Sequence, residues 1–148
     1  MLKRIGKYRR ELSTMAALTI SGKIYKKHFA GSINSEKIIQ GLEHLRHHIG
    51  GPFILIWDRS RTHRSKLVQK YLQAYPEIHI EFLPAYAPQL NPEEFCHGNV
   101  KHRVKNSVFL SVIDMRKALD HGFARLRKRP DILLGCFHHA GLTLNQLW

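Results

Sequence analysis

Phe53-Ile54-Leu55-Ile56-Trp57-Asp58 is an apolar run that ends on a carboxylate, and this stretch decides the fold of the chain. Its five consecutive apolar residues predict a strand buried on both faces, as in the interior of an α/β sheet. A second stretch, Leu83-Pro84-Ala85-Tyr86-Ala87-Pro88-Gln89-Leu90-Asn91-Pro92-Glu93-Glu94, is a proline-stiffened loop that brings another carboxylate to the start of a helix. Two carboxylates on rigid elements at a sheet edge suit a site that binds divalent metal and acts on phosphate.

The elements around this strand complete an α/β pattern. Apolar spacing and turn residues predict a hairpin first, then alternating helices and strands. A strand, a helix and a strand in that order imply a right-handed parallel crossover. The expected spans are strands over 12–20, 24–29 and 78–83, and helices from Asn34 or Ser35 to Gly50, over 62–75, 92–105, 112–127 and 130–140.

The composition indicates one globular domain with a strongly basic surface. The 148 residues are 43% hydrophobic, and 24 Lys and Arg against 11 Asp and Glu give a formal charge of +13. This charge favours DNA or RNA as the partner, with a ribosome-associated or merely basic protein as the alternative. Two basic clusters directly follow the two acids, and we expect them to bind phosphates beside the chemistry. They are Arg59, Arg61, Arg64 and Lys66, and then Lys101, Arg103 and Lys105.

Cysteine usage and hydropathy indicate a soluble, cytoplasmic protein. Cys96 and Cys136 are far apart in the sequence, so neither a C-x-x-C metal knuckle nor a disulfide framework is indicated. No apolar run is long enough to cross a bilayer, so no membrane partner is expected. His44, His47 and His48 share one predicted helix, but without a further ligand a polar helix face is favoured over a metal site.

The motifs around the two acids resemble those of a known family. Trp57-Asp58 precede His63-Arg64-Ser65, and the loop from Leu83 to Glu94 reads L-P-x-Y-x-P-x-L-N-P-x-E. This pattern, followed by Lys101, is similar to the DDE transposase domain of bacterial insertion sequences related to the mariner elements. The resemblance runs from about Leu12 onward, so residues 11–148 are expected to form a partial catalytic domain after a basic leader at 1–10.

The resemblance implies an RNase H-like fold, shared with retroviral integrases, in which flanking helices cover a mixed sheet. Such domains hold two Mg²⁺ or Mn²⁺ ions with three carboxylates during in-line attack on a phosphodiester. Asp58 then corresponds to the second acid and Glu94 to the third, because the motif places that ligand after Asn-Pro-x. Glu93 is expected to face solvent. His63 and Asn91 are supporting residues: His63 is expected to orient a phosphate or a metal-binding carboxylate, and Asn91 to shape the turn before the helix.

Simpler structural roles stay open for three of these residues. Asp58 could cap the helix that follows it, and Glu94 could be a first-turn acid favoured by the helix dipole. His63 could make only a local hydrogen bond at the start of a helix.

The first aspartate of the family's triad has no counterpart in the sequence. In the family it lies on a strand upstream of the hairpin, and Glu11 is the only acid before Leu12. RNase H-like sheets run in the order 3-2-1-4-5, so the missing strand is the central one, beside the strand over 53–57. We therefore expect the downstream part of a transposase, made as a separate frame, joined by frameshifting or left as a relic. An upstream fragment that supplies the strand and the aspartate is an expected partner.

The expected function is DNA cleavage and strand transfer in the transposition of an insertion sequence. Transposon ends and target DNA are the expected partners, a homo-oligomer the active assembly, and the bacterial nucleoid the location. Whether the chain is an enzyme by itself stays open, because one acid is missing. The alternatives are a catalytically inactive DNA-binding or assembly subunit, which would bind DNA independently of metal, and an RNA-processing nuclease of the same fold.

Overall fold

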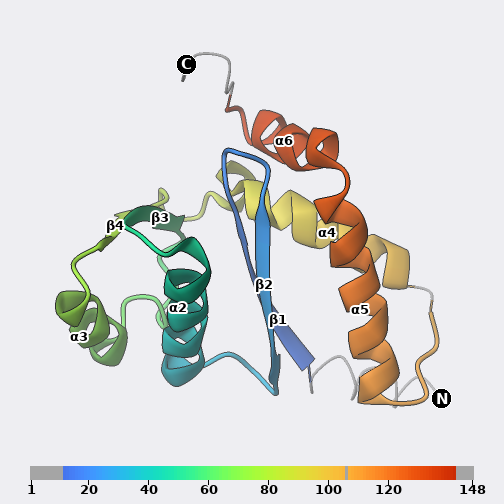
Figure 1. Cartoon of the computed structure of the whole chain (residues 1–148), viewed down its shortest axis with the longest axis horizontal. Coiled ribbons are helices and arrows are strands. Elements are labelled where there is room, and N and C mark those ends of the chain that lie inside the picture. The colour runs from blue at the N-terminus through green and yellow to red at the C-terminus, as the bar shows by residue number, and fades with distance from the viewer. Residues whose placement is uncertain (1–11, 106, 143–148) are drawn as a thin grey trace. The chain divides into compact units, whose positions relative to one another are not determined.

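The computed structural model describes residues 12–105 and 107–142, which form two units (Figure 1). Unit 2 is Ile33–Pro88, and unit 1 comprises the residues before and after it. Each unit contains a two-stranded sheet and helices packed within that unit. The basic leader expected at residues 1–10 lies outside the described residues.

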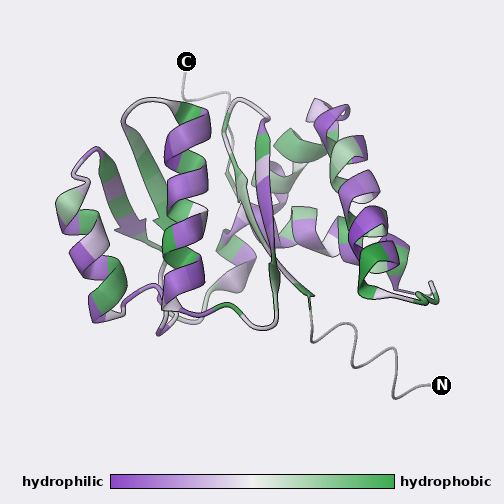
Figure 2. Ribbon diagram, turned by 60° about the horizontal axis from the view of Figure 1, so that its bottom comes forward, coloured by the Kyte–Doolittle hydropathy of each residue, from purple (hydrophilic) through white to green (hydrophobic). Residues whose placement is uncertain are grey.

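Unit 2 is a parallel β-α-β unit preceded by a helix. Its elements are α2 (Ser35–Ile49), β3 (Phe53–Trp57), α3 (Lys66–Ala74) and β4 (Ile78–Phe82). β3 and β4 are parallel, as predicted, and α2 packs against α3. Figure 2 shows hydrophilic and hydrophobic segments alternating along α2, as expected of a helix with one buried face. The buried apolar side chains of the unit are Ile38, Leu42, Leu45, Trp57, Val68 and Ile78.

Local signals determine where the helices of unit 2 begin and end. The side chain of Asn34 accepts a hydrogen bond from the Lys37 N–H and caps α2, while Gly50 ends it with a φ of 71°. The second helix begins at Lys66, four residues later than predicted, because the Ser65 side chain accepts from the Val68 N–H and caps α3 there. Residues 61–64 form turns instead.

The prediction that β3 is buried on both faces is wrong. Ile54 is 66% exposed and Ile56 59%, whereas Trp57 is only 6% exposed. Alternate residues of a strand point to opposite faces, and in unit 2 only the Trp57 face is covered. An apolar run cannot reveal this, since it does not say which neighbouring elements pack on each face.

Unit 1 is an antiparallel hairpin packed against helices. Its elements are β1 (Leu12–Leu18), β2 (Ile24–Ala30), α4 (Pro92–Val104), α5 (Val112–Arg127) and α6 (Pro130–His139). β1 contacts α4, β2 contacts α5, and α4 contacts both α5 and α6. A short 3₁₀ turn, η1 (Pro88–Leu90), precedes α4. These elements agree with the predicted spans to within about two residues.

The core of unit 1 lies between the hairpin and the three helices. Its buried members are Ile24, Cys96, Val100, Met115, Leu119, Phe123, Leu126, Leu133 and Cys136. α4 and α5 approach closely at Gly122, because a Cβ there would lie 2.9 Å from Cγ1 of Val100. The two cysteines, 40 positions apart, are also neighbours here, with 2.7 Å between their Sγ atoms, and both are free thiols.

A polar cluster crosses from β2 to α5 at the side of this core. His28 Nε2 lies 2.8 Å from Oδ1 of Asp120, and Lys26 pairs with the same oxygen. Thr14 contacts His28 Nδ1 at 2.7 Å. The His28 side chain is only 3% exposed. Burial, and then the charge of Lys26, lower the pKa of His28 to about 4, so this histidine is neutral at pH 7.

Candidate active site

Asp58 lies directly after the carboxyl end of β3, where α/β sheets place ligands. Its side chain is 55% exposed, and its Oδ1 accepts a hydrogen bond from the Ser60 N–H at 2.9 Å. The same oxygen lies 2.8 Å from Nδ1 of His63. Because Ser65 and not Asp58 caps α3, the helix-cap role left open for Asp58 is wrong.

His63 is held between the carboxylate and an aromatic ring. Its imidazole stacks on the Trp57 indole, with 4.1 Å between ring centroids and 5° between planes. The side chain is 17% exposed, and Nδ1 is also 3.1 Å from the Asp58 carbonyl oxygen. With Nδ1 directed at Asp58, Nε2 is the ring nitrogen left for another group. The stacking role of Trp57 was not predicted, although the residue is adjacent to the acid in sequence.

Arg59 ties the ends of the two parallel strands together. Its Nε donates to the Leu83 carbonyl oxygen at 3.1 Å, and its guanidinium lies 5.8 Å from the ring centroid of Phe82. The Leu83 N–H donates to the Trp57 carbonyl oxygen at 2.8 Å. The proline-rich motif therefore begins at the same edge of the β3–β4 sheet as Asp58. The other basic residues predicted for this region are all exposed: Arg61, Arg64 and Lys66.

Glu94 lies in the first turn of α4 and is exposed. Asn91 caps this helix, because its Oδ1 accepts from the Glu93 N–H at 3.1 Å, and Pro92 occupies the first helical position. A first-turn position suits the electrostatic role left open for Glu94 as well as a catalytic one. The cations Lys101, Arg103 and Lys105 are exposed at the other end of α4.

Glu93 does not face solvent, contrary to the prediction. Its side chain is 19% exposed, and its Oε1 lies 2.7 Å from Nδ1 of His97 one turn later. His97 in turn meets Phe123 of α5 edge-on, with 6.0 Å between ring centroids. The i to i+4 spacing of Glu93 and His97 allows this pair, but only the packing of α5 shows that it is half-buried.

The two acids belong to different units, Asp58 to unit 2 and Glu94 to unit 1. Across residues 12–105 and 107–142, no group of three or more His, Cys, Asp and Glu side chains is arranged to hold a metal ion. On α2, His48 Nδ1 lies 2.8 Å from the His44 carbonyl oxygen, and the two rings pack 4.2 Å apart.

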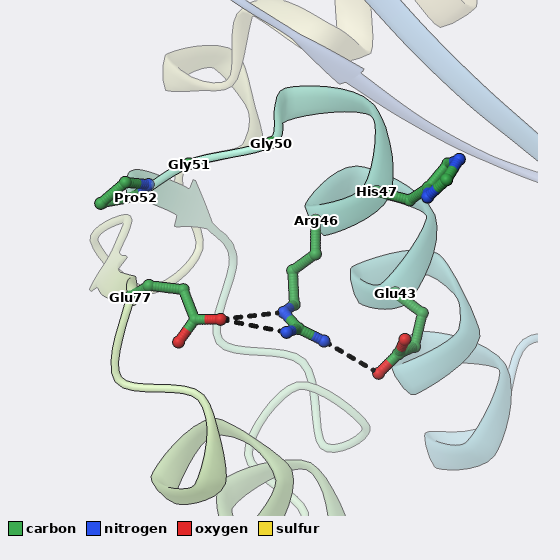
Figure 3. A pocket seen from close by; sticks show the side chains of 7 residues that line it. All are labelled: Glu43, Arg46, His47, Gly50, Gly51, Pro52 and Glu77. Atoms are coloured by element: carbon green, nitrogen blue, oxygen red, sulfur yellow. Dashed lines mark hydrogen bonds and ion pairs between the residues drawn. The ribbon is translucent and has the colours of Figure 1, made fainter.

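A polar pocket of about 510 Å³ lies at the opposite end of β3 from Asp58 (Figure 3). Residues 50–52, which precede β3, form part of its wall. Arg46 lies between two acids, with Nη2 3.1 Å from Glu77 and Nη1 3.3 Å from Glu43. Its guanidinium also lies 3.6 Å from the ring centroid of Tyr75. These contacts join α2 to the segment before β4, and the pocket is separate from the edge that carries Asp58.

Comparison with known proteins identifies the family. A model of the DDE superfamily endonuclease family matches residues 3–116, which is most of the chain. The chain belongs to the DDE superfamily endonuclease family. The match includes both candidate acids and the whole proline-rich motif.

Solved structures of a mariner transposase, Mos1, share the fold. The Mos1 strand transfer complex matches with a TM-score of 0.63 and 21% identity over 88% of this chain and 43% of the Mos1 chain. The Mos1 mariner paired-end complex with Mn matches with a TM-score of 0.63 and 20% identity over 86% of this chain and 43% of that one. The catalytic domain of Mos1 mariner transposase matches with a TM-score of 0.58 and 17% identity over 95% of this chain and 87% of that one. No curated protein shows a significant match.

These matches confirm the predicted fold class, an RNase H-like α/β fold with flanking helices. The chain spans less than half the length of the Mos1 chain in the strand transfer and paired-end complexes. None of the helices in the described residues is long and apolar enough to cross a membrane.

Proposed function

We propose that this DDE-family chain contributes to metal-dependent cleavage and strand transfer of DNA in the transposition of an insertion sequence. The observation that carries the proposal is the exposed carboxylate of Asp58 at the end of β3, held by the Ser60 N–H and by His63 stacked on Trp57. A carboxylate held in this way keeps a fixed orientation without being buried. A residue that binds a metal ion beside a charged substrate needs both a fixed orientation and exposure.

Asp58 and Glu94 are the residues that would hold a divalent metal. Both are exposed carboxylates, the hard oxygen ligands that Mg²⁺ and Mn²⁺ prefer. The hydrogen-bond contacts of the Asp58 side chain within residues 12–105 and 107–142 all fall on Oδ1, which leaves Oδ2 as a ligand. When bound, two such metals supply an activated nucleophile and stabilise the leaving oxygen. A relative of the same fold has been solved with Mn.

The neighbouring residues of this chain have roles around that chemistry. His63 keeps the Asp58 carboxylate oriented through Nδ1 and presents Nε2 to a phosphate oxygen. Asn91 fixes the start of the helix that carries Glu94. The exposed cations after each acid bind the DNA backbone: Arg59, Arg61, Arg64 and Lys66, and Lys101, Arg103 and Lys105.

The first aspartate of the family's triad is proposed to arrive on a further strand. In the described residues β3 pairs only with β4, so the second edge of β3 has no partner strand there. A strand that paired with this edge would place its own residues beside Asp58.

We propose that the active form is a homo-oligomer on transposon ends and target DNA, at the nucleoid of a bacterial cell.

The second candidate function is a catalytically inactive DNA-binding or assembly subunit of a transposase. The charge of +13 favours it as much as it favours the enzyme, because charge alone supports binding. It differs from the first proposal in that DNA affinity would not depend on metal or on Glu94.

The test measures Mn²⁺ binding to the full chain in the presence of duplex DNA. Calorimetry or electron paramagnetic resonance detects the bound metal. We expect Asp58→Asn and Glu94→Gln each to weaken Mn²⁺ binding by more than about tenfold. Glu81→Gln is the matched control, because Glu81 is an exposed carboxylate on β4. If both variants bind Mn²⁺ as the unmodified chain does, the metal proposal is wrong.

A nicking assay on supercoiled plasmid in Mg²⁺ or Mn²⁺ then separates the two functions. Nicking that is lost in both variants and in EDTA supports the endonuclease. DNA binding that is unchanged by EDTA and by Glu94→Gln, without nicking, supports the inactive subunit.

A further inference from the structure

The end of α5 crosses α4 in unit 1 (Figure 1). Three arginines belong to this region: Arg103, Arg125 and Arg129. Arg125, in the last turn of α5, donates from Nη2 to Oδ1 of Asn99 on α4 at 2.6 Å. Arg103 lies one turn after Asn99 on the same face of α4, and Arg129 precedes α6. Arg125 therefore lies near two further arginines, and the charges of both act on it.

The Arg125 guanidinium is in an environment that does not suit an unpaired cation. The residue is half-buried, and its Nε is enclosed without a hydrogen-bond partner in the described part of the chain. The hydrogen bond of the Arg125 guanidinium to Asn99 has a neutral amide as its acceptor. Burial lowers the pKa of Arg125, and the nearby charges of Arg103 and Arg129 lower it further. Each of these features destabilises the charged form in the absence of an anion.

The carboxylate beside Arg129, Asp131, is already paired. Asp131 accepts from Nε of Arg129 at 2.9 Å and from Nη2 at 2.7 Å. This bidentate pair is exposed and compensates only Arg129. Arg125 and Arg103 have no ion pair within residues 12–105 and 107–142. Arg127 and Lys128 add further positive charge close to Arg125 in the sequence.

We propose that Arg125, Arg103 and Arg129 form a binding site for one backbone phosphate of the DNA, with Asn99 holding Arg125 in place. A guanidinium presents paired donors to phosphate oxygens, and a pre-positioned guanidinium loses less side-chain entropy on binding. The site extends the basic cluster that follows Glu94, to which Arg103 belongs, by three residues outside it: Arg125, Arg129 and Asn99. The inference rests on the proposed function, which makes DNA the substrate.

A salt titration of DNA binding tests the proposal with the full chain. Fluorescence anisotropy of a labelled DNA duplex, in EDTA, gives the affinity over a series of salt concentrations. We expect Arg125→Gln to weaken binding by about fivefold or more and to reduce the slope of log affinity against log salt by about 0.9, the value for one lost phosphate contact. Lys117→Gln is the matched control: it removes one charge from the exposed side of α5 and should change the affinity by less than about twofold.

Two more variants separate phosphate binding from a purely structural role. Asn99→Ala removes the support of Arg125 but no charge, so it should leave the salt slope unchanged. Arg129→Gln changes an exposed side chain outside the cluster that follows Glu94, and it should reduce the slope as Arg125→Gln does, even if Arg125→Gln does not fold by circular dichroism.

The outcomes distinguish the site from the wider proposal. If the chain binds DNA but Arg125→Gln and Arg129→Gln behave like Lys117→Gln, the phosphate site is refuted and the proposed function stands. If the unmodified chain binds no DNA at all, the proposed function fails and this inference fails with it.

Discussion

Replacing Gly122 by alanine tests the packing of α5 on the helix that carries Glu94. A Cβ at this position would lie 2.9 Å from Cγ1 of Val100. Val100 is fully buried, and its β-branched side chain has one preferred rotamer in a helix, so the methyl group cannot turn away at low cost. The two helices must separate slightly, or Val100 must leave its rotamer.

The magnitude follows from two opposing terms. Alanine in place of glycine inside a helix stabilises it by up to about 1 kcal/mol. Overpacking a well-filled core costs about 1–3 kcal/mol. Gly98 in α4 gives the matched control, because a Cβ there has no atom within 4 Å and its site is exposed. The propensity term is common to both substitutions, so Gly122→Ala should be less stable than Gly98→Ala by about 1–3 kcal/mol.

The assay is thermal and urea unfolding of the two variants beside the unmodified chain. For a chain of this size, the expected difference corresponds to about 3–9 °C in melting temperature. Gly98→Ala should melt at or above the unmodified chain. If Gly122→Ala is as stable as Gly98→Ala, then α4 and α5 are not in contact at Val100 and this account of the core is wrong.

Three further predictions concern other parts of the chain. The pKa of His28 is lowered from 6.5 to about 4 in the folded state, so the unfolded chain binds the proton more tightly. The melting temperature of the chain should therefore fall as the pH drops from 6.5 towards 4. The melting temperature of His28→Gln should fall less steeply over the same range. Ser65→Ala removes the cap of α3 and should cost about 1 kcal/mol in urea unfolding, and an unchanged stability would contradict the cap. Cys96 and Cys136 are buried with raised pKa values, so a thiol-alkylating reagent at pH 8 should modify them only in denaturant; rapid labelling of the native chain would contradict this burial.

Local sequence signals predicted most of the secondary structure, because the physical causes are themselves local. Asn34 and Gly50 bound α2 through a side-chain cap and a left-handed φ, each of which involves residues within one turn. Pro92 marks the start of α4 for a similar reason. The late start of α3 shows the limit: the helix was expected from Thr62, and the structure begins it at Lys66 with Ser65 as the cap.

Features that join distant segments could not be predicted in the same way. The sequence indicated neither that Cys96 and Cys136 touch nor that Arg125 bonds to Asn99, since each contact depends on how α4, α5 and α6 pack. The expectation that Glu93 faces solvent was wrong for the same reason. Glu93 pairs with His97, and His97 packs against Phe123 of α5, which is distant in the sequence.

By itself, the sequence determined the order of the elements, the two carboxylates and the motif that shows the family, because these depend on residue type and spacing. Only the tertiary structure decided which face of β3 is covered, that His63 stacks on Trp57 while it contacts Asp58, and that Arg125 bonds to Asn99 near two further arginines. Burial, ion pairing and desolvation are properties of neighbouring groups in space. A pattern along the chain contains no information about neighbours that folding brings from elsewhere.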